Sequence, residues 1–128
     1  MKYWMGLMLF VLVGCTSTMY GRKPTKNQAE SWGCNYPNLI QTYEEDQAQL
    51  TPGYVRTPQI GWTMCTILAK IGHPGQVGQV YRSAYGASVN FYYRIPGDGV
   101  ATLATEGTIR FEKKPGMRDW IVVSISGF

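Results

Sequence analysis

Two stretches of the chain space their apolar residues as amphipathic helices do. Residues 61–74 (GWTMCTILAKIGHP) are the clearer case, because the apolar positions follow i, i+3, i+4 and i+7. These positions are Met64, Ile67, Leu68 and Ile71. Thr63 is placed to cap the start, and Gly72 with Pro74 ends the helix. The pattern predicts a short helix whose stability must come from packing.

Residues 35–50 predict a second helix with a weaker apolar face. Ile40, Tyr43 and Leu50 fall on one side, and Gln47 interrupts them. An acidic patch at residues 44–46 is expected on the far side, as a solvated face. Residues 51–61 hold two prolines and two glycines and are expected to form a loop.

Beyond Pro74 the pattern changes to the alternation typical of strands. Val89, Phe91, Tyr93 and Ile95 share one face of a first strand. Residues 100–112 predict a second strand with a bulge near Gly107. Residues 120–126 predict a third, with Ile121, Val123 and Ile125 on one face. Turns are expected at 96–99 and 114–119, and residues 76–82 remain open between strand and loop.

These elements predict an α+β fold in which two helices pack on a three-stranded antiparallel sheet, in the order αα-βββ. One sheet face would pack on the helices, and the other would stay wet or bind a partner. The expected division is a signal peptide at residues 1–14, a flexible tether at 15–32 and one folded domain at 33–128.

The first residues have the pattern of an export signal. Lys2 precedes an apolar run at residues 5–13, which is shorter than the roughly 20 residues that a membrane-spanning helix needs. The sequence Leu12, Val13, Gly14, Cys15 resembles the lipobox of bacterial lipoproteins. The resemblance implies cleavage before Cys15 and lipidation of its thiol. The alternative is an anchoring helix or a buried strand with an incidental cysteine.

The residue after the cysteine bears on location. In lipoproteins of this kind an acidic residue there retains the protein at the inner membrane. The residue here is Thr16, so the resemblance implies a lipid anchor in the outer membrane, facing the periplasm.

Assigning Cys15 to lipid leaves Cys34 and Cys65 as an even pair in an oxidising compartment. A disulfide between them is one possibility, and two unpaired, packed cysteines are the other. An antiparallel helix hairpin would separate them, because each cysteine lies near the start of its helix, whereas the long connection could bring them together. The sequence leaves the pairing open.

The charge is mildly positive, at +4 for the whole chain. This is too little for a nucleic-acid footprint, so no nucleic-acid partner is expected. The basic residues of the sheet region are candidates for contact with an envelope protein or anionic phospholipid, and solubility is the simpler explanation for any one of them. They are Arg94, Arg110, Lys113, Lys114 and Arg118.

The order of parts resembles the SmpA/OmlA (BamE-like) family of small outer-membrane lipoproteins. The matching residues are Gly61 to Thr63, then Ile71 to Pro74, and the aromatic "FYYR" at residues 91–94. Trp62 stands where the family usually has Met, and the loop before Gly61 is longer. The resemblance implies a non-catalytic accessory subunit of a barrel-assembly complex. The alternative is an inhibitory, exclusion, conjugation or secretion lipoprotein that binds one protein partner.

No catalytic or metal-binding motif appears in the sequence, so neither an enzyme nor a cofactor is expected. The single histidine, His73, lies in the helix stop and is interpreted as structural. The glycine-rich residues 72–78 follow a helix, whereas a phosphate loop precedes one.

Overall fold

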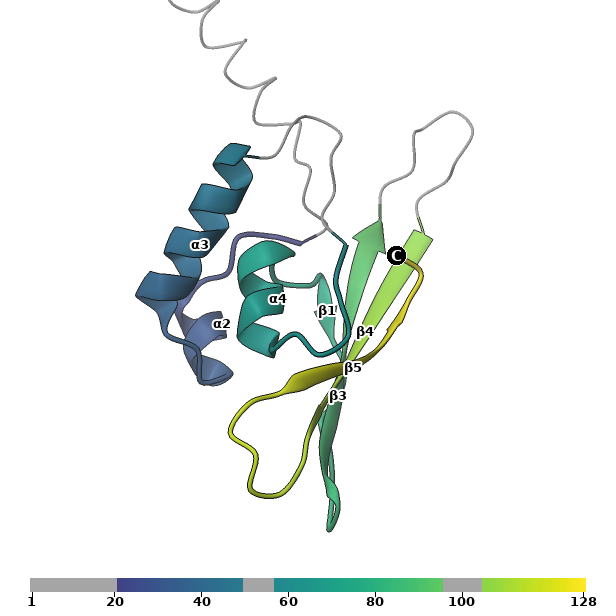
Figure 1. Ribbon diagram of the computed structural model, residues 1–128. Helices are drawn as coiled ribbons and strands as arrows, with labels where there is room; N and C mark the ends of the chain where they lie inside the picture. Colours follow the sequence, from purple (N-terminus) through teal and green to yellow (C-terminus); the bar gives the residue numbers. More distant parts are fainter. Residues whose placement is uncertain (1–20, 50–56, 96–104) are drawn as a thin grey trace, which may run out of the picture.

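The computed structural model describes residues 21–49, 57–95 and 105–128. Cys15, the signal peptide and the expected turn at 96–99 therefore lie outside the described residues. The fold is α+β, with all the labelled helices on one side of an antiparallel sheet (Figure 1). The helices are α2 (Lys26–Ser31), α3 (Tyr36–Gln49) and α4 (Met64–Lys70).

The sheet has more strands than the three predicted. Its strands are β1 (Gln76–Val77), β2 (Tyr81–Ser83), β3 (Gly86–Ile95), β4 (Thr105–Lys113) and β5 (Ile121–Ser126). The order is β1-β3-β4-β5, and β2 pairs with β3 on the same edge as β1. Thus the α+β class is confirmed, but the described residues form three helices and five strands rather than two and three.

The core lies between α4 and the apolar face of β3 and β4. Val89, Phe91 and Tyr93 are buried, as the alternation predicted, and Ile109 and Phe111 face them from β4. The Phe91 and Phe111 rings meet edge to face at 4.7 Å between centroids. This aromatic face is what the helices cover.

Helix α4 matches its prediction closely. Met64, Ile67, Leu68 and Ile71 are each no more than 1% exposed. The Thr63 side chain accepts a hydrogen bond from the Thr66 N–H, which caps the helix start. With only seven residues, α4 depends on this burial rather than on its own propensity.

The end of α4 joins the helix to both the sheet and the N-terminal segment. Gly72 has a φ of +102°, a conformation that favours glycine. Its carbonyl accepts a 2.7 Å hydrogen bond from the buried Tyr93 hydroxyl. Gly21 and Arg22 pair with this stop: the Gly21 N–H donates to the Ile71 carbonyl, and Arg22 and His73 exchange two backbone bonds. The folded domain therefore begins at least as early as Gly21.

The prediction of a flexible tether through residue 32 is therefore wrong from residue 21 onward. Thr25 and Gln28 form a capping box at the start of α2. Ala29 is fully buried. The centroid of the Trp32 ring lies 5.7 Å from that of Phe91 and 5.8 Å from that of Trp120. The polar composition hid these features, because α2 is mostly exposed and contacts the core through one small residue, Ala29, and the aromatic Trp32 that follows it.

Helix α3 forms where predicted, but with a different buried face. Leu39, Tyr43 and Asp46 point inward, while Ile40 is only partly buried. Asp46 was expected in a solvated acidic patch, yet it is 9% exposed and lies 3.3 Å from the Lys70 ammonium. Leu50 lies outside the described residues.

A disulfide joins Cys34 to Cys65, with 5.7 Å between their Cα atoms. Cys34 precedes α3 and Cys65 lies in the first turn of α4, so the disulfide brings the helix starts together. The Asp46–Lys70 pair links later parts of the same helices. The helices therefore run in the same general direction, and the antiparallel hairpin that argued against pairing is not formed (Figure 1).

Strand β5 departs from the predicted face. Phe111 pairs with Val122 and Arg110 with Ser124, which leaves Val123 as the extra residue of a bulge. Trp120 and Val122 are buried, whereas Val123 is exposed. The bulge expected near Gly107 is absent from the described pairing with β3 and β5. Gly107 instead leaves space for the Phe128 ring, because a Cβ at residue 107 would lie 2.6 Å from that ring.

The disulfide is expected to contribute substantially to stability. Replacing Cys34 and Cys65 together with Ser should lower the free energy of unfolding by about 3 to 4 kcal/mol, because the unfolded chain gains loop entropy over a separation of 31 residues. Urea unfolding measures the change. A reductant should produce the same fall in the wild type and none in the variant. Coincident unfolding curves for the two oxidised proteins would contradict the prediction.

Gly72→Ala tests the junction at the end of α4. A Cβ there would lie 2.7 Å from the Gly21 carbonyl carbon, in a backbone conformation that disfavours side chains. We expect a loss of about 2 to 4 kcal/mol in thermal or urea unfolding, with faster proteolysis before residue 26. Gly75→Ala is the matched control, because nothing lies within 4 Å of its added Cβ. Equal effects of the two variants would refute this account.

Candidate interaction surface

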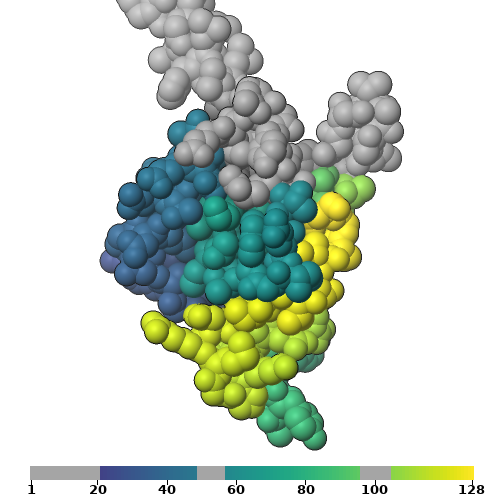
Figure 2. Space-filling view, in the orientation of Figure 1, coloured from purple at the N-terminus to yellow at the C-terminus, as the bar shows by residue number. Residues whose placement is uncertain are grey.

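One end of the sheet projects beyond the helices (Figure 1). It consists of the β2–β3 hairpin, whose Ser83–Gly86 pair encloses the turn residues Ala84 and Tyr85, and the adjoining end of β4 with the turn that follows. We call residues 81–88 and 110–119 the basic tip. The space-filling view shows the hairpin as a narrow projection at the lower end of the molecule (Figure 2).

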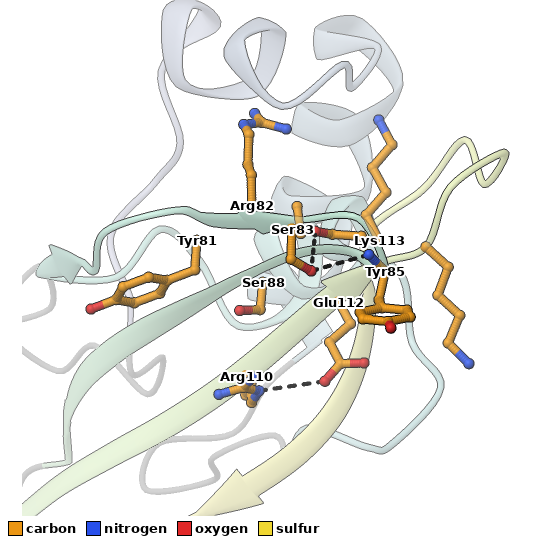
Figure 3. A pocket seen from close by; sticks show the side chains of 11 residues that line it. Tyr81, Arg82, Ser83, Tyr85, Ser88, Arg110, Glu112 and Lys113 are labelled. Atoms are coloured by element: carbon orange, nitrogen blue, oxygen red, sulfur yellow. Dashed lines mark hydrogen bonds and ion pairs between the residues drawn. The ribbon is translucent and has the colours of Figure 1, made fainter.

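Two cations of the basic tip share a face of the sheet. Arg82 pairs with Ala87, and Ala87 pairs with Lys113, so the three residues form one cross-strand row. Figure 3 shows Arg82 and Lys113 rising on the same side of the strands. Because they lie two strands apart, their backbones are separated by roughly 10 Å. The small Ala87 side chain leaves the space between them open.

The opposite face of the basic tip is polar and hollowed. Tyr81, Ser88 and Glu112 form the neighbouring row. The Arg110 guanidinium lies 3.5 Å from the Glu112 carboxylate, and both side chains are substantially exposed. These residues help to line a shallow pocket of about 200 Å³ (Figure 3). Since Arg110 is already paired, it offers less free charge than Arg82 or Lys113.

Apolar and aromatic side chains are exposed at the same place. Tyr81 is 66% exposed, Tyr85 is 89% exposed and Met117 is 39% exposed. A single exposed apolar residue needs no explanation. Here three of the five large ones in the described part of the chain gather among basic side chains. Tyr, Met and Arg are also the residue types enriched at protein interfaces.

The net positive charge of the described residues lies entirely in the basic tip. The tip holds five basic and two acidic residues, and the remaining described residues hold five of each. The basic residues of the tip are Arg82, Arg110, Lys113, Lys114 and Arg118. The net charge of the described residues is therefore concentrated at one end, where its field is strongest.

The structure brings together four of the five predicted contact residues. Arg110, Lys113, Lys114 and Arg118 belong to the tip, but Arg94 does not. Arg94 lies near the other end of β3, opposite Glu106, and lines a separate hollow beside Gln76.

Sequence reasoning missed Arg82 together with Tyr81 and Tyr85. The hairpin turn Ala84–Tyr85 lacks the Asn-Gly or Asp-Gly signature that marks such turns. Every residue of β2 is also exposed, so no apolar alternation marks it as a strand. The only available signal was Gly86 directly before the alternating residues of β3.

Two titratable side chains of the described residues, His73 and Tyr93, have their pKa values shifted by burial. His73 Nδ1 lies 2.8 Å from the Pro74 carbonyl, and burial lowers the pKa of its imidazole. Burial also raises the pKa of Tyr93 well above its ordinary value, which keeps the hydroxyl protonated as the donor to Gly72. Within 21–49, 57–95 and 105–128, no three His, Cys, Asp or Glu residues are placed to hold a metal ion. No helix in these ranges is long and apolar enough to cross a membrane.

Comparison of the chain with protein-family models, curated protein sequences and solved structures gives no match.

The single histidine gives a testable pH dependence. Because the pKa of His73 is lowered in the folded protein, the unfolded chain binds the proton more readily. The stability contribution is present above the ordinary histidine pKa of about 6.5 and is lost as pH falls through the folded value. Urea unfolding of the wild type should therefore show falling stability between about pH 7 and pH 5. His73→Asn should flatten that fall, and parallel profiles would contradict the assignment.

Proposed function

We propose that this chain is a lipid-anchored envelope lipoprotein that serves as a non-catalytic scaffold or accessory subunit of an outer-membrane complex, of the BamE-like barrel-assembly type. The observation that carries the proposal is the sequence Leu12-Val13-Gly14-Cys15 behind a short apolar run. Acylation of Cys15 with two or more chains would hold the protein stably on a membrane without spanning it.

The Cys34–Cys65 disulfide supports an extracytoplasmic location. Disulfides persist in oxidising compartments such as the bacterial periplasm and are rare in the cytosol. The pairing also accounts for the cysteine count, because the remaining cysteine is the one in the lipobox-like motif.

The arrangement of elements is compatible with the family resemblance. The described residues form three helices and then five strands, of which β3, β4 and β5 are the longest, and we propose that α3 and α4 with these three strands correspond to the αα-βββ scaffold of the family. The family-like residues 61–63 and 71–74 bound α4, while residues 91–94 lie in β3. Together with an exposed basic and aromatic surface, this supports a binding role, with an envelope protein as the partner.

Lipidation and sorting test the proposal directly. Cells producing the wild type and given labelled palmitate should yield a labelled protein in the outer-membrane fraction. Cys15→Ala should lose the label, because no other cysteine follows a lipobox-like sequence. Thr16→Asp is the matched control: it should keep the label but move to the inner membrane.

The partner is tested by pull-down from detergent-extracted outer membranes with mass spectrometry. The wild type should recover barrel-assembly proteins, and Cys15→Ala should not. Label retained by Cys15→Ala would contradict the anchor. Recovery of conjugation components instead would contradict the barrel-assembly role.

A further inference from the structure

We propose that the basic tip is a docking surface for an acidic segment of a protein, presented away from the membrane that holds the anchor. The inference rests on the proposed lipid anchor for its orientation. The charges and exposed side chains that form the docking surface all belong to described residues.

The end of the domain to which the anchor connects lies far from the basic tip. The described chain begins at Gly21, which is bonded to the Ile71 carbonyl beside the stop of α4. That stop contacts Tyr93 near the far end of β3. Tyr93 and Gly86 are seven residues apart, which corresponds to roughly 23 Å along a strand. The attachment point and the hairpin therefore lie toward opposite ends of β3 (Figure 1).

The connection between Cys15 and the folded domain is short. Only residues 16–20 separate Cys15 from Gly21, so the connection spans at most about 22 Å even when fully extended. The predicted tether ran from residue 15 to residue 32, so the actual connection to the folded domain is shorter than predicted. It holds the Gly21 end of the domain close to the headgroups. Arg22 is exposed at this end, where a basic residue would favour an anionic surface, whereas Lys23 is paired with the Glu44 carboxylate at 3.4 Å. The basic tip is then directed toward the aqueous side.

The basic tip offers positive charges beside shallow hollows. Arg82, Lys113 and Lys114 line hollows on both faces of the hairpin. On the side of Lys113, the second hollow is bounded by the turn residues Pro115–Met117. The Arg82 and Lys113 backbones lie roughly 10 Å apart in one cross-strand row, so each long side chain can meet a separate carboxylate of one acidic segment. Met117 supplies an apolar contact beside them.

A labelled oligoglutamate peptide tests the chemistry. Full-length protein in detergent should bind the peptide, with affinity that falls as salt rises. The double variant Arg82→Glu/Lys113→Glu should bind about tenfold more weakly, because two favourable charges become repulsive. Arg94→Glu is the matched control, since it reverses a charge on the same sheet outside the tip. Equal binding by both variants, or no binding by the wild type, would overturn the proposal.

Photo-crosslinking in isolated membranes tests the orientation and the kind of partner. A crosslinking amino acid at Tyr85 should give a protein adduct that is lost in the Arg82→Glu/Lys113→Glu background, and the crosslinked peptide should be acidic. The same amino acid at Arg94 should not give this adduct. Lipid adducts at Tyr85, or tip-dependent binding to phosphatidylglycerol vesicles in place of the peptide, would overturn the proposal in favour of a membrane contact.

The two proposals fail separately. If Cys15→Ala keeps the palmitate label while the peptide result holds, the anchor is contradicted and the acidic-segment site stands. If the label is lost as expected but the tip variants bind the peptide normally, the docking surface alone is contradicted.

Discussion

The fold depends on the packing of α4 against the aromatic face of β3 and β4. A helix of seven residues has no stability of its own in water. Burial of Met64, Ile67, Leu68 and Ile71 holds it in place, and the Tyr93–Gly72 hydrogen bond fixes where it ends. That fixed end receives Gly21 and Arg22, so the packing of one short helix also determines where the N-terminal segment joins the domain.

The helix layer is held together by two links of different kinds. The disulfide joins the starts of α3 and α4, and the Asp46–Lys70 pair joins them farther along. Asp46 is largely buried, although the helix pattern assigned it to solvent, and the Lys70 ammonium supplies the partner that a buried carboxylate requires. Together the links hold α3 beside α4 on one side of the sheet, and the hairpin end projects beyond the helices (Figure 1).

Much of this fold could be predicted where the apolar period was long and regular. Helix α4 and the buried face of β3 follow directly from their patterns. Other elements depend on tertiary context that a local pattern does not contain: Ala29 and Trp32 attach a polar, mostly exposed helix to the core, and the extra residue Val123 shifts the face of β5. Most of the basic surface was predicted from charge alone. Arg82 was missed because β2 has an exposed, atypical hairpin, and Arg94 was included because the sequence gives no distances.

The bulge in β5 also bears on how the protein avoids self-association. Strand β5 is the outer strand on its side of the sheet, and an outer strand invites pairing with another chain. Its first half is covered, because Gly61 and Trp62 bond to Val122, and Met64 bonds to the carbonyl of the preceding Trp120. In its second half the bulge at Val123 interrupts the regular edge before Ser124 and Ser126. Within the described residues, the β5 edge therefore presents no long flat strand along which fibres could grow.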